Sequence, residues 1–371
     1  MSFRTTISYI LWPLTIWYAI GVAVRNFLYA IGLKRQEAPH VTTIGVGNLS
    51  SGGTGKTPHV EYILRLLADR YPTAMLSRGY KRKSKGFVLD DGTHDVALLG
   101  DEAAMIARKF PQVQVAVCEK RVEGVRQLMA SSAAVSESQG NPKTTGKPQV
   151  IVLDDVFQHR AIKPSVNILL TEYGHPFFDD HIMPYGNLRE FKSARFRAGI
   201  VIVTKCPALL NPVEKHNIIH DLNLQNFQKI FFSYLKYGPL QTLEGRATGI
   251  DLRNVDNVLA VTGIAHPEPM IAELRRSTKV QHMAFADHHA FRNRDIKRIS
   301  DAFEALKGSN NIIVTTEKDA MRLRGKTGDL PVYILPVEVA FHEAAERDFD
   351  YLIDFTVSEN ISFLSKLSIW S

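Results

Sequence analysis

The chain has 371 residues and a formal net charge of +7, from 45 basic and 38 acidic side chains. Its hydrophobic content of 45% and charged content of 22% are typical of a globular protein, which excludes a disordered, collagen-like or coiled-coil chain. At about 150 residues per domain, the length predicts two domains. Cys118 and Cys206 are too few for a disulfide framework or a four-cysteine zinc site, so a reducing cytosol is the default compartment. The basic excess favours anionic partners.

The chain starts with an apolar segment. Residues 7–24 carry no charged side chain and include the aromatic residues Tyr9, Trp12, Trp17 and Tyr18. As a helix this segment would be about 27 Å long, slightly shorter than a hydrocarbon core of roughly 30 Å. It therefore suits a short tilted span or a helix in the membrane interface, with a helix buried on its own domain as the alternative. Val24-Arg25-Asn26 is a poor signal-peptide cleavage site. We expect residues 1–35 to form a membrane-associated helix.

A phosphate-binding loop follows the first predicted strand, at residues 41–47. Such a loop needs small residues whose N–H groups turn toward one anion, a lysine for the β- and γ-phosphates, a hydroxyl for Mg²⁺ and a helix N-terminus. These requirements are met, in order, by Ser50, Ser51, Gly52, Gly53, Thr54, Gly55, Lys56 and Thr57. Ser50 stands where the usual pattern begins with glycine, and an ordinary glycine turn is the alternative interpretation.

A pair of carboxylates follows another predicted strand. Residues 150–153 are apolar and lead into Asp154 and Asp155, the form of a Mg²⁺ site at the end of a strand. An N-cap with a solvated neighbour is the alternative, and spacing alone does not say which aspartate binds the metal. The guanine-specifying pattern is nearly present at Thr204-Lys205-Cys206-Pro207 but lacks its aspartate, which disfavours a GTPase.

Candidate strands alternate with helical stretches along the chain. In its first part they are expected at residues 41–47, 73–76, 113–118, 150–154, 166–171 and 199–204. This alternation predicts an α/β fold, namely a P-loop NTPase-type, mostly parallel sheet with helices on both faces. We expect residues 36–228 to form this P-loop domain, with a mobile insert at about 130–148, where Ser, Gly, Asn, Pro and Thr are frequent.

A second alternating set predicts a smaller C-terminal α/β domain over residues 251–371, joined through an extended connector at 229–250. Its strands are expected at 258–262, 280–285, 312–316 and 332–335.

A basic run at residues 81–85 is the strongest local concentration of charge. A solvated loop is its ordinary interpretation, and attraction to an anionic membrane or a phosphorylated substrate is the functional one. No helix-turn-helix, zinc-finger or RNA-binding aromatic motif occurs in the sequence. We therefore expect no nucleic-acid partner.

The motifs taken together resemble the tetraacyldisaccharide 4′-kinase family of the lipid A pathway in Gram-negative bacteria. The resemblance spans nearly the whole chain, including its aromatic N-terminal segment. Val156 replaces a usual glycine, and Pro184-Tyr185-Gly186-Asn187 differs from the usual Pro-Ala-Gly-Pro, which affects the expected loop geometry. The matching stretches are, in order, Val46-Gly47-Asn48-Leu49-Ser50, Gly52-Gly53-Thr54-Gly55-Lys56-Thr57-Pro58, Ser77-Arg78-Gly79-Tyr80, Gly100-Asp101-Glu102, Leu153-Asp154-Asp155-Val156-Phe157-Gln158-His159-Arg160, Gly186-Asn187-Leu188-Arg189-Glu190, Thr262-Gly263-Ile264-Ala265, Phe285-Ala286-Asp287-His288 and Thr315-Thr316-Glu317-Lys318-Asp319.

The resemblance implies a membrane-associated kinase with ATP and Mg²⁺ as cofactors. It implies transfer of the γ-phosphate of ATP to the 4′-hydroxyl of a tetraacylated glucosamine disaccharide 1-phosphate, which gives lipid IVA. The enzyme would act at the cytoplasmic face of the inner membrane, against its lipid surface, and no obligate protein partner is expected.

The resemblance also implies roles for individual residues. Lys56 would steady the β- and γ-phosphates, and Asp101 would be the base for the 4′-hydroxyl, oriented by His288 of the second domain. The metal would be held by Thr57, Asp154, Asp155 and Glu190. The same cleft would be lined by His159, Arg189, Arg78 and Arg121.

Two other functions stay open on the sequence. A P-loop kinase of a soluble metabolite would not need the apolar segment at residues 7–33. A membrane-anchored ATP switch would bind partners in one nucleotide state and would not need the pair of Asp101 and His288.

Overall fold

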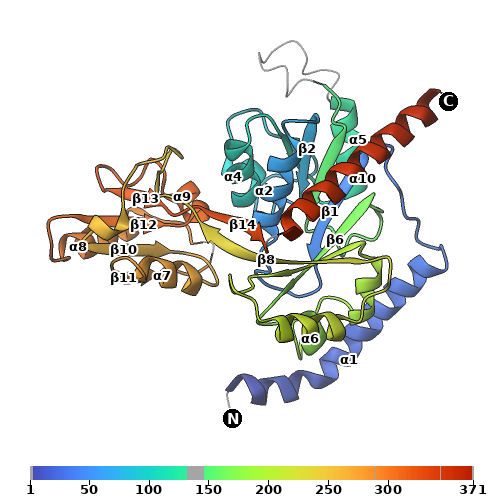
Figure 1. Ribbon diagram of the computed structural model, residues 1–371, viewed down its shortest axis with the longest axis horizontal. Helices are drawn as coiled ribbons and strands as arrows, with labels where there is room; N and C mark the ends of the chain where they lie inside the picture. Colours follow the sequence, from blue (N-terminus) through green and yellow to red (C-terminus); the bar gives the residue numbers. More distant parts are fainter. Residues whose placement is uncertain (1–2, 132–145, 288, 343, 370–371) are drawn as a thin grey trace.

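Two β-sheets organise the chain, of which the computed structural model describes residues 3–131, 146–287, 289–342 and 344–369. Within these ranges the larger sheet has nine strands, in the order β14-β8-β7-β6-β1-β5-β2-β4-β3. The smaller has five strands, in the order β11-β10-β12-β13-β9. Figure 1 shows the smaller sheet extending to one side of the larger one.

The larger sheet is parallel except at its edges, where β3 pairs antiparallel with β4 and β14 with β8. Each strand expected between residues 41 and 204 is present to within one residue at either end, so the α/β class with a mostly parallel sheet is confirmed. The strands are β1 (Thr42–Asn48), β2 (Thr73–Ser77), β3 (Val88–Leu89), β4 (Gln114–Val117), β5 (Val150–Asp154), β6 (Val166–Glu172), β7 (Ile200–Thr204), β8 (Lys229–Tyr237) and β14 (Val337–Phe341).

Both faces of the larger sheet are covered, which explains why its central strands are apolar almost without interruption. Successive side chains point to opposite faces. Ile44 and Val46 share one hydrophobic cluster with α2 (Lys56–Leu67), α4 (Asp101–Lys109) and α10 (Ala344–Ile369). Ile151 and Leu153 belong to the opposite cluster, which includes α5 (Arg121–Ser131).

The remaining elements extend this frame. The five-stranded sheet consists of β9 (Gln241–Thr242), β10 (Asn257–Thr262), β11 (Lys279–Ala284), β12 (Asn311–Thr315) and β13 (Val332–Ile334). The other helices are α1 (Phe3–Ala30), α3 (Val96–Leu99), α6 (Pro212–Leu222), α7 (Glu268–Arg275), α8 (Asn293–Glu304) and α9 (Glu317–Leu323), with 3₁₀ turns η2 (Phe177–Asp179), η3 (Lys192–Arg197) and η4 (Leu252–Asn254).

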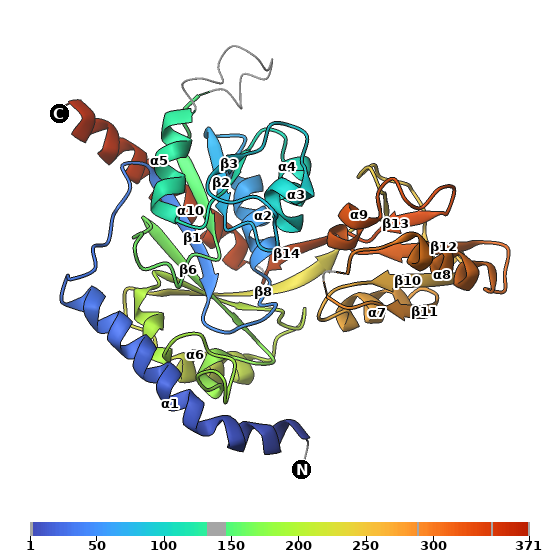
Figure 2. The same ribbon diagram turned by 180° about the vertical axis from the view of Figure 1, so that it is seen from behind.

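The sequence predicted an extended connector at residues 229–250 and a separate domain at 251–371. In the structure, parts of both segments belong to the larger sheet. The first half of β8 extends the larger sheet beside β7, and its second half pairs with β14, where Phe341 lies opposite Ser233. Helix α10 then buries Phe349 and Ile353 in the core of the larger sheet. Residues 337–369 therefore return to the first sheet, because the edge of β8 and the apolar face of α2 need partners. The two strands β8 and β14 link the sheets (Figures 1 and 2).

Helix α1 lies along the outside of the larger sheet, past α6 (Figure 1). Among the described residues, no helix combines the length and hydropathy needed to cross a bilayer. The predicted insert at about 130–148 lies mostly outside the described residues.

Gly47 gives a direct test of how closely the chain after β5 packs on β1. A Cβ atom at Gly47 would lie 2.8 Å from the backbone nitrogen of Phe157, closer than side chains tolerate. We expect Gly47→Ala to lower the free energy of unfolding by about 1–3 kcal/mol, because the obstructing atom is backbone and cannot rotate away. Urea denaturation would measure this, with Gly199→Ala as the control, since nothing lies within 4 Å of its added Cβ. Equal stability of both variants would contradict the close packing.

Candidate active site

The phosphate loop joins β1 to α2 and is held by hydrogen bonds to two other segments. The Thr54 carbonyl accepts a hydrogen bond from Thr204 Oγ1 at 2.9 Å, and the Ser51 N–H donates to the Asn187 carbonyl at 2.7 Å. Gly55 has a φ of 82° where the loop enters α2, a conformation that favours glycine. The loop lies between the end of a strand and the N-terminus of a helix, as the sequence predicted. It includes Ser50, Gly52 and Gly53.

Lys56 lies at the centre of a charged cluster at this end of the sheet. Its Nζ donates to Asn48 Oδ1 at 3.2 Å and lies 3.5 Å from Asp155 Oδ1. Arg189 contacts the same carboxylate, with Nη1 3.2 Å from Oδ2. Burial would raise the pKa of Asp155, but Lys56 and Arg189 outweigh it and hold that pKa below its ordinary value. The three residues therefore form a cation-rich group in which Asp155 stays ionised.

Asp154 is in a different environment one residue earlier. Its side chain is buried, and its Oδ1 atom has no hydrogen-bond partner among the described residues. Burial, together with the charges of Glu102 and Asp155, raises the pKa of this carboxyl to about 7. A buried carboxylate oxygen without a donor is what a divalent cation would satisfy.

The residues present fit a Mg²⁺ ion held mainly by its nucleotide. No group of three or more His, Cys, Asp or Glu side chains in the described ranges could hold a metal by itself. Mg²⁺ bound with a nucleotide ordinarily uses one or two carboxylates and the phosphates. Asp154 would supply the carboxylate, and Thr57, in the first turn of α2, the hydroxyl.

Glu190 is placed differently from the expected metal ligand. Its side chain is fully buried, and each of its two oxygens forms an ion pair, one with Arg25 of α1 and one with Arg197 of η3. Both oxygens are thus already engaged by guanidinium groups. The carboxylate therefore helps to hold α1 on the larger sheet, and its expected role as a metal ligand stays a prediction.

The remaining basic residues of the cleft surround His159. The Arg121 guanidinium is buried and donates to the Cys118 and Asp154 carbonyls at 2.7 and 2.8 Å. Burial lowers the pKa of His159 to about 4, with Arg121 and Arg78 acting in the same direction. His159 is therefore neutral near pH 7, in a region of positive potential.

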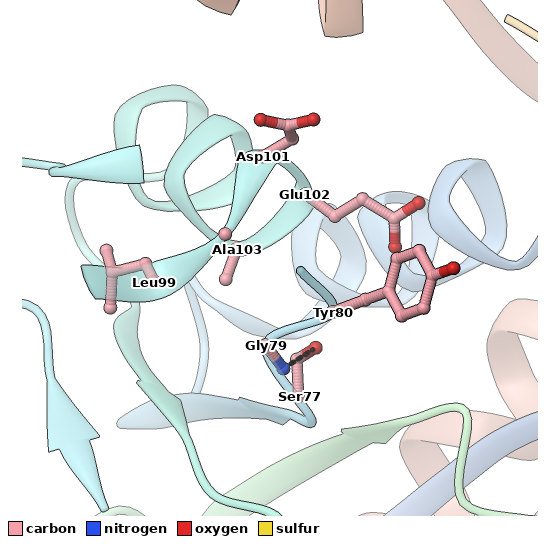
Figure 3. A pocket seen from close by; sticks show the side chains of 8 residues that line it. Ser77, Gly79, Tyr80, Leu99, Asp101, Glu102 and Ala103 are labelled. Carbon is pink, nitrogen blue, oxygen red and sulfur yellow. Dashed lines mark hydrogen bonds between the residues drawn. The ribbon is translucent and has the colours of Figure 1, made fainter. Parts of the chain in front are cut away.

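Asp101 begins α4 and faces the second sheet. Its carboxylate lies 3.6 Å from Arg322 of α9, and its neighbour Glu102 forms an ion pair with Lys318 of the same helix. A small pocket beside Asp101 and Glu102 is also lined by Tyr80 of the motif at 77–80 (Figure 3). In Figure 3 the Glu102 and Tyr80 side chains extend to the same side. His288, the expected partner of Asp101, lies outside the described residues.

Several contacts of this region are absent from the predictions based on sequence. Arg322 lies outside all the motifs that match the family. Lys318 lies in the matching stretch at residues 315–319, for which the sequence predicted no role. Gln158, which donates to the Asn48 carbonyl at 2.6 Å, likewise lies in a motif without a predicted role. Local sequence gives no signal for these pairings, since Lys318 and Glu102 are 216 residues apart.

Comparison with known proteins identifies the family. The model of the family described as tetraacyldisaccharide-1-P 4′-kinase matches residues 7–354. The chain belongs to this family. It is 41% identical to the tetraacyldisaccharide 4′-kinase of Bacteroides thetaiotaomicron, over 94% of this chain and 93% of that protein, and 39% identical to that of Flavobacterium johnsoniae, over 95% and 98%.

A solved structure agrees with this assignment. The crystal structure of LpxK from Aquifex aeolicus in complex with ATP superposes with a TM-score of 0.71 at 28% identity, covering 95% of this chain and 99% of that one. The family resemblance inferred from the motifs is confirmed.

The contrast between Asp154 and Asp155 leads to a prediction about stability. The pKa of Asp154 in the folded state, about 7, lies above its ordinary value of 3.8, so the folded protein favours the protonated carboxyl and loses stability as the pH rises from about 4 to 7. Asp154→Asn keeps the shape without the buried charge. Without nucleotide, we expect its free energy of unfolding at pH 8 to exceed that of the wild type by about 1–3 kcal/mol, and the difference to shrink at pH 5.

Urea denaturation at the two pH values would measure the difference. Asp155→Asn is the matched control, since it removes the partner of Lys56 and Arg189 and should lower stability at pH 8. A loss of stability in both variants at pH 8 would contradict the assigned environments.

Proposed function

We propose that this chain transfers the γ-phosphate of ATP to the 4′-hydroxyl of tetraacyldisaccharide 1-phosphate, giving lipid IVA, at the cytoplasmic face of the inner membrane. The observation that carries the proposal is the group of Lys56, Asp155 and Arg189 at the phosphate loop, beside the unsatisfied Asp154 oxygen. Phosphoryl transfer is catalysed mainly by positioning and by neutralising charge, and this group supplies both. Family membership supports the choice of donor and acceptor.

Each residue of the group has a task that follows from its contacts. Lys56, held by Asn48 and Asp155, directs its ammonium toward the β- and γ-phosphates. Arg189 stays close because the same Asp155 carboxylate holds it. Asp154 and Thr57 would hold Mg²⁺, which when bound would offset the negative charge of the phosphates.

Asp101 is the proposed base. The acceptor oxygen forms a bond to the γ-phosphorus, the bond from that phosphorus to the β–γ bridging oxygen breaks, and ADP leaves. The hydroxyl proton passes to the Asp101 carboxylate. Arg322, whose Nε lies 3.6 Å from it, orients that carboxylate while α9 is docked on α4.

The surface of α1 supports a membrane-bound acceptor over a soluble one. The side facing the protein carries polar contacts: Tyr18 OH donates to the Arg189 carbonyl at 3.1 Å, and Arg25 pairs with Glu190. The opposite side exposes large apolar residues at helical spacing, namely Trp17, Ile20, Val24, Phe27 and Ile31. An apolar face directed away from the protein suits a helix that lies in a membrane interface, and a kinase of soluble metabolites has no need of it.

Transfer of label tests the activity and the base together. With γ-³²P-labelled ATP, Mg²⁺ and tetraacyldisaccharide 1-phosphate in detergent micelles, we expect the wild type to label the lipid. Asp101→Asn should reduce kcat about 100-fold or more, since general bases typically contribute about 10²–10⁴-fold. Asp329→Asn, an exposed aspartate beyond α9, should keep the wild-type rate.

The alternatives give different results in the same assay. Unreduced labelling in Asp101→Asn would keep the kinase and reject the base. ATP hydrolysis without labelled lipid would favour the soluble-acceptor kinase or the ATP switch.

The role of α1 is tested without deleting it, because deletion would leave Glu190 buried without Arg25. We expect the double substitution of Trp17→Ser and Phe27→Ser to reduce sedimentation with phospholipid vesicles about tenfold or more, since it removes two large side chains that are 73% and 61% exposed. Activity in detergent micelles should persist. Phe227→Ser, at a side chain 64% exposed elsewhere, is the control. Unchanged vesicle binding by the double variant would reject the interfacial helix.

A further inference from the structure

A second cavity lies beside the phosphate site, and the assigned reaction steps do not use it. Its volume is about 320 Å³, within the roughly 300–1,000 Å³ typical of small-molecule sites. It is formed by the chain between β5 and β6, the start of β6, η3 and the segment that follows α1. His159 lines it, and this residue also belongs to the basic cleft around Asp155. The cavity is thus adjacent to the proposed site of phosphoryl transfer.

The cavity wall is cationic. Arg160, Lys163 and Arg197 line it, and no acidic side chain does so among the described residues. Arg197 is paired with Glu190, and Arg160 Nη1 contacts the Asn26 carbonyl and Oδ1 of α1 at 3.3 and 3.1 Å. No ion pair is formed by Lys163 in the described part of the chain, and its side chain is exposed. Positive charge remains available there to an anion.

Two buried polar atoms of the wall lack partners. Arg160 Nε, a donor, and Asn167 Oδ1, an acceptor, have no hydrogen-bond partner among the described residues. Buried polar groups are ordinarily satisfied, and these two atoms are shielded from water, so a ligand would reach them only if the wall shifts. The cationic wall itself suits an anion, and a sugar phosphate offers its phosphate oxygens to it. The ring of Phe196 adds an apolar surface.

We propose that this cavity binds a phosphomonoester, the 1-phosphate at the end of the disaccharide away from the hydroxyl that is phosphorylated. This assignment rests on the proposed function. The two ends of the acceptor are chemically different, so a cationic site at one end would select the orientation that presents the 4′-hydroxyl to the γ-phosphate. The phosphate of a bilayer lipid has similar chemistry, and the test must separate the two sources.

Lys163 is the residue to change, because it carries no ion pair that holds the fold together. In detergent micelles, we expect Lys163→Ala to raise the KM for the 1-phosphorylated acceptor about three- to tenfold, the value of one charge-assisted contact. The kcat and the KM for ATP should stay unchanged. With an acceptor that lacks the 1-phosphate, wild type and variant should have the same KM. Lys163→Arg should restore the wild-type KM, and Lys297→Ala, an exposed lysine of α8, should leave it unaltered.

Other outcomes overturn the assignment. An equal rise in KM for both acceptors would place sugar or acyl contacts at Lys163, and a rise in the KM for ATP would make the cavity part of the nucleotide site. An effect confined to vesicles with anionic phospholipid would assign the cavity to a lipid headgroup. Unchanged kinetics with every acceptor would leave the cavity without this role.

Direct binding keeps the test independent of turnover. In a ³¹P NMR titration, N-acetylglucosamine 1-phosphate should bind the wild type and lose at least threefold in affinity in Lys163→Ala. Equal binding by both proteins would reject the cavity even if lipid is phosphorylated. Failure of the wild type to phosphorylate any acceptor would reject the proposed function, while retained differential binding would still support the anion site.

Discussion

The carboxylates of Asp154 and Asp155 follow one another at the buried end of β5, and two adjacent anions destabilise a fold unless cations or protons offset them. The structure treats the two differently. Asp155, with a φ of 46°, turns toward Lys56 and Arg189 and stays ionised. Asp154 keeps an oxygen without a hydrogen bond, and burial raises its pKa. One carboxylate thereby fixes the loop's cations in place, and the other is the carboxylate that we propose receives Mg²⁺.

The same requirement connects the phosphate site to α1. Glu190 is fully buried, so both Arg25 and Arg197 are needed to offset its charge. Removing one partner of a buried ion pair typically costs about 3–5 kcal/mol, which makes α1 an integral part of the fold. Arg189, the preceding residue in the chain, contacts Asp155 and accepts a hydrogen bond from Tyr18 through its carbonyl. Two consecutive residues thus join the apolar outer helix to the site of phosphoryl transfer.

Local sequence predicts the parts of this structure that depend on local patterns. The parallel strands are buried on both faces and therefore read as continuous apolar runs, and the phosphate loop depends on the spacing of residues close in the chain. The pairing of β8 with β14 was missed because each strand alone is compatible with an extended connector. The ion pair between Glu190 and Arg25 was not predicted, because the two residues lie 165 positions apart in the chain.

The position of the second sheet depends on contacts of another kind. Apart from the two strands β8 and β14, α9 meets α4 through three ion pairs: Lys318 with Glu102, Arg322 with Asp101, and Glu317 with Lys109. Lys109 also pairs with Glu61 of α2. Burial and Glu317 raise the pKa of Glu61 to about 7, and Lys109 counteracts them. Polar contacts of this type are typical of interfaces that open and close, whereas an apolar core is not. Met321 of α9 also packs against the core of the larger sheet. The side of α4 that carries Asp101 and Glu102 is therefore joined to the second sheet by ion pairs beside a small apolar contact.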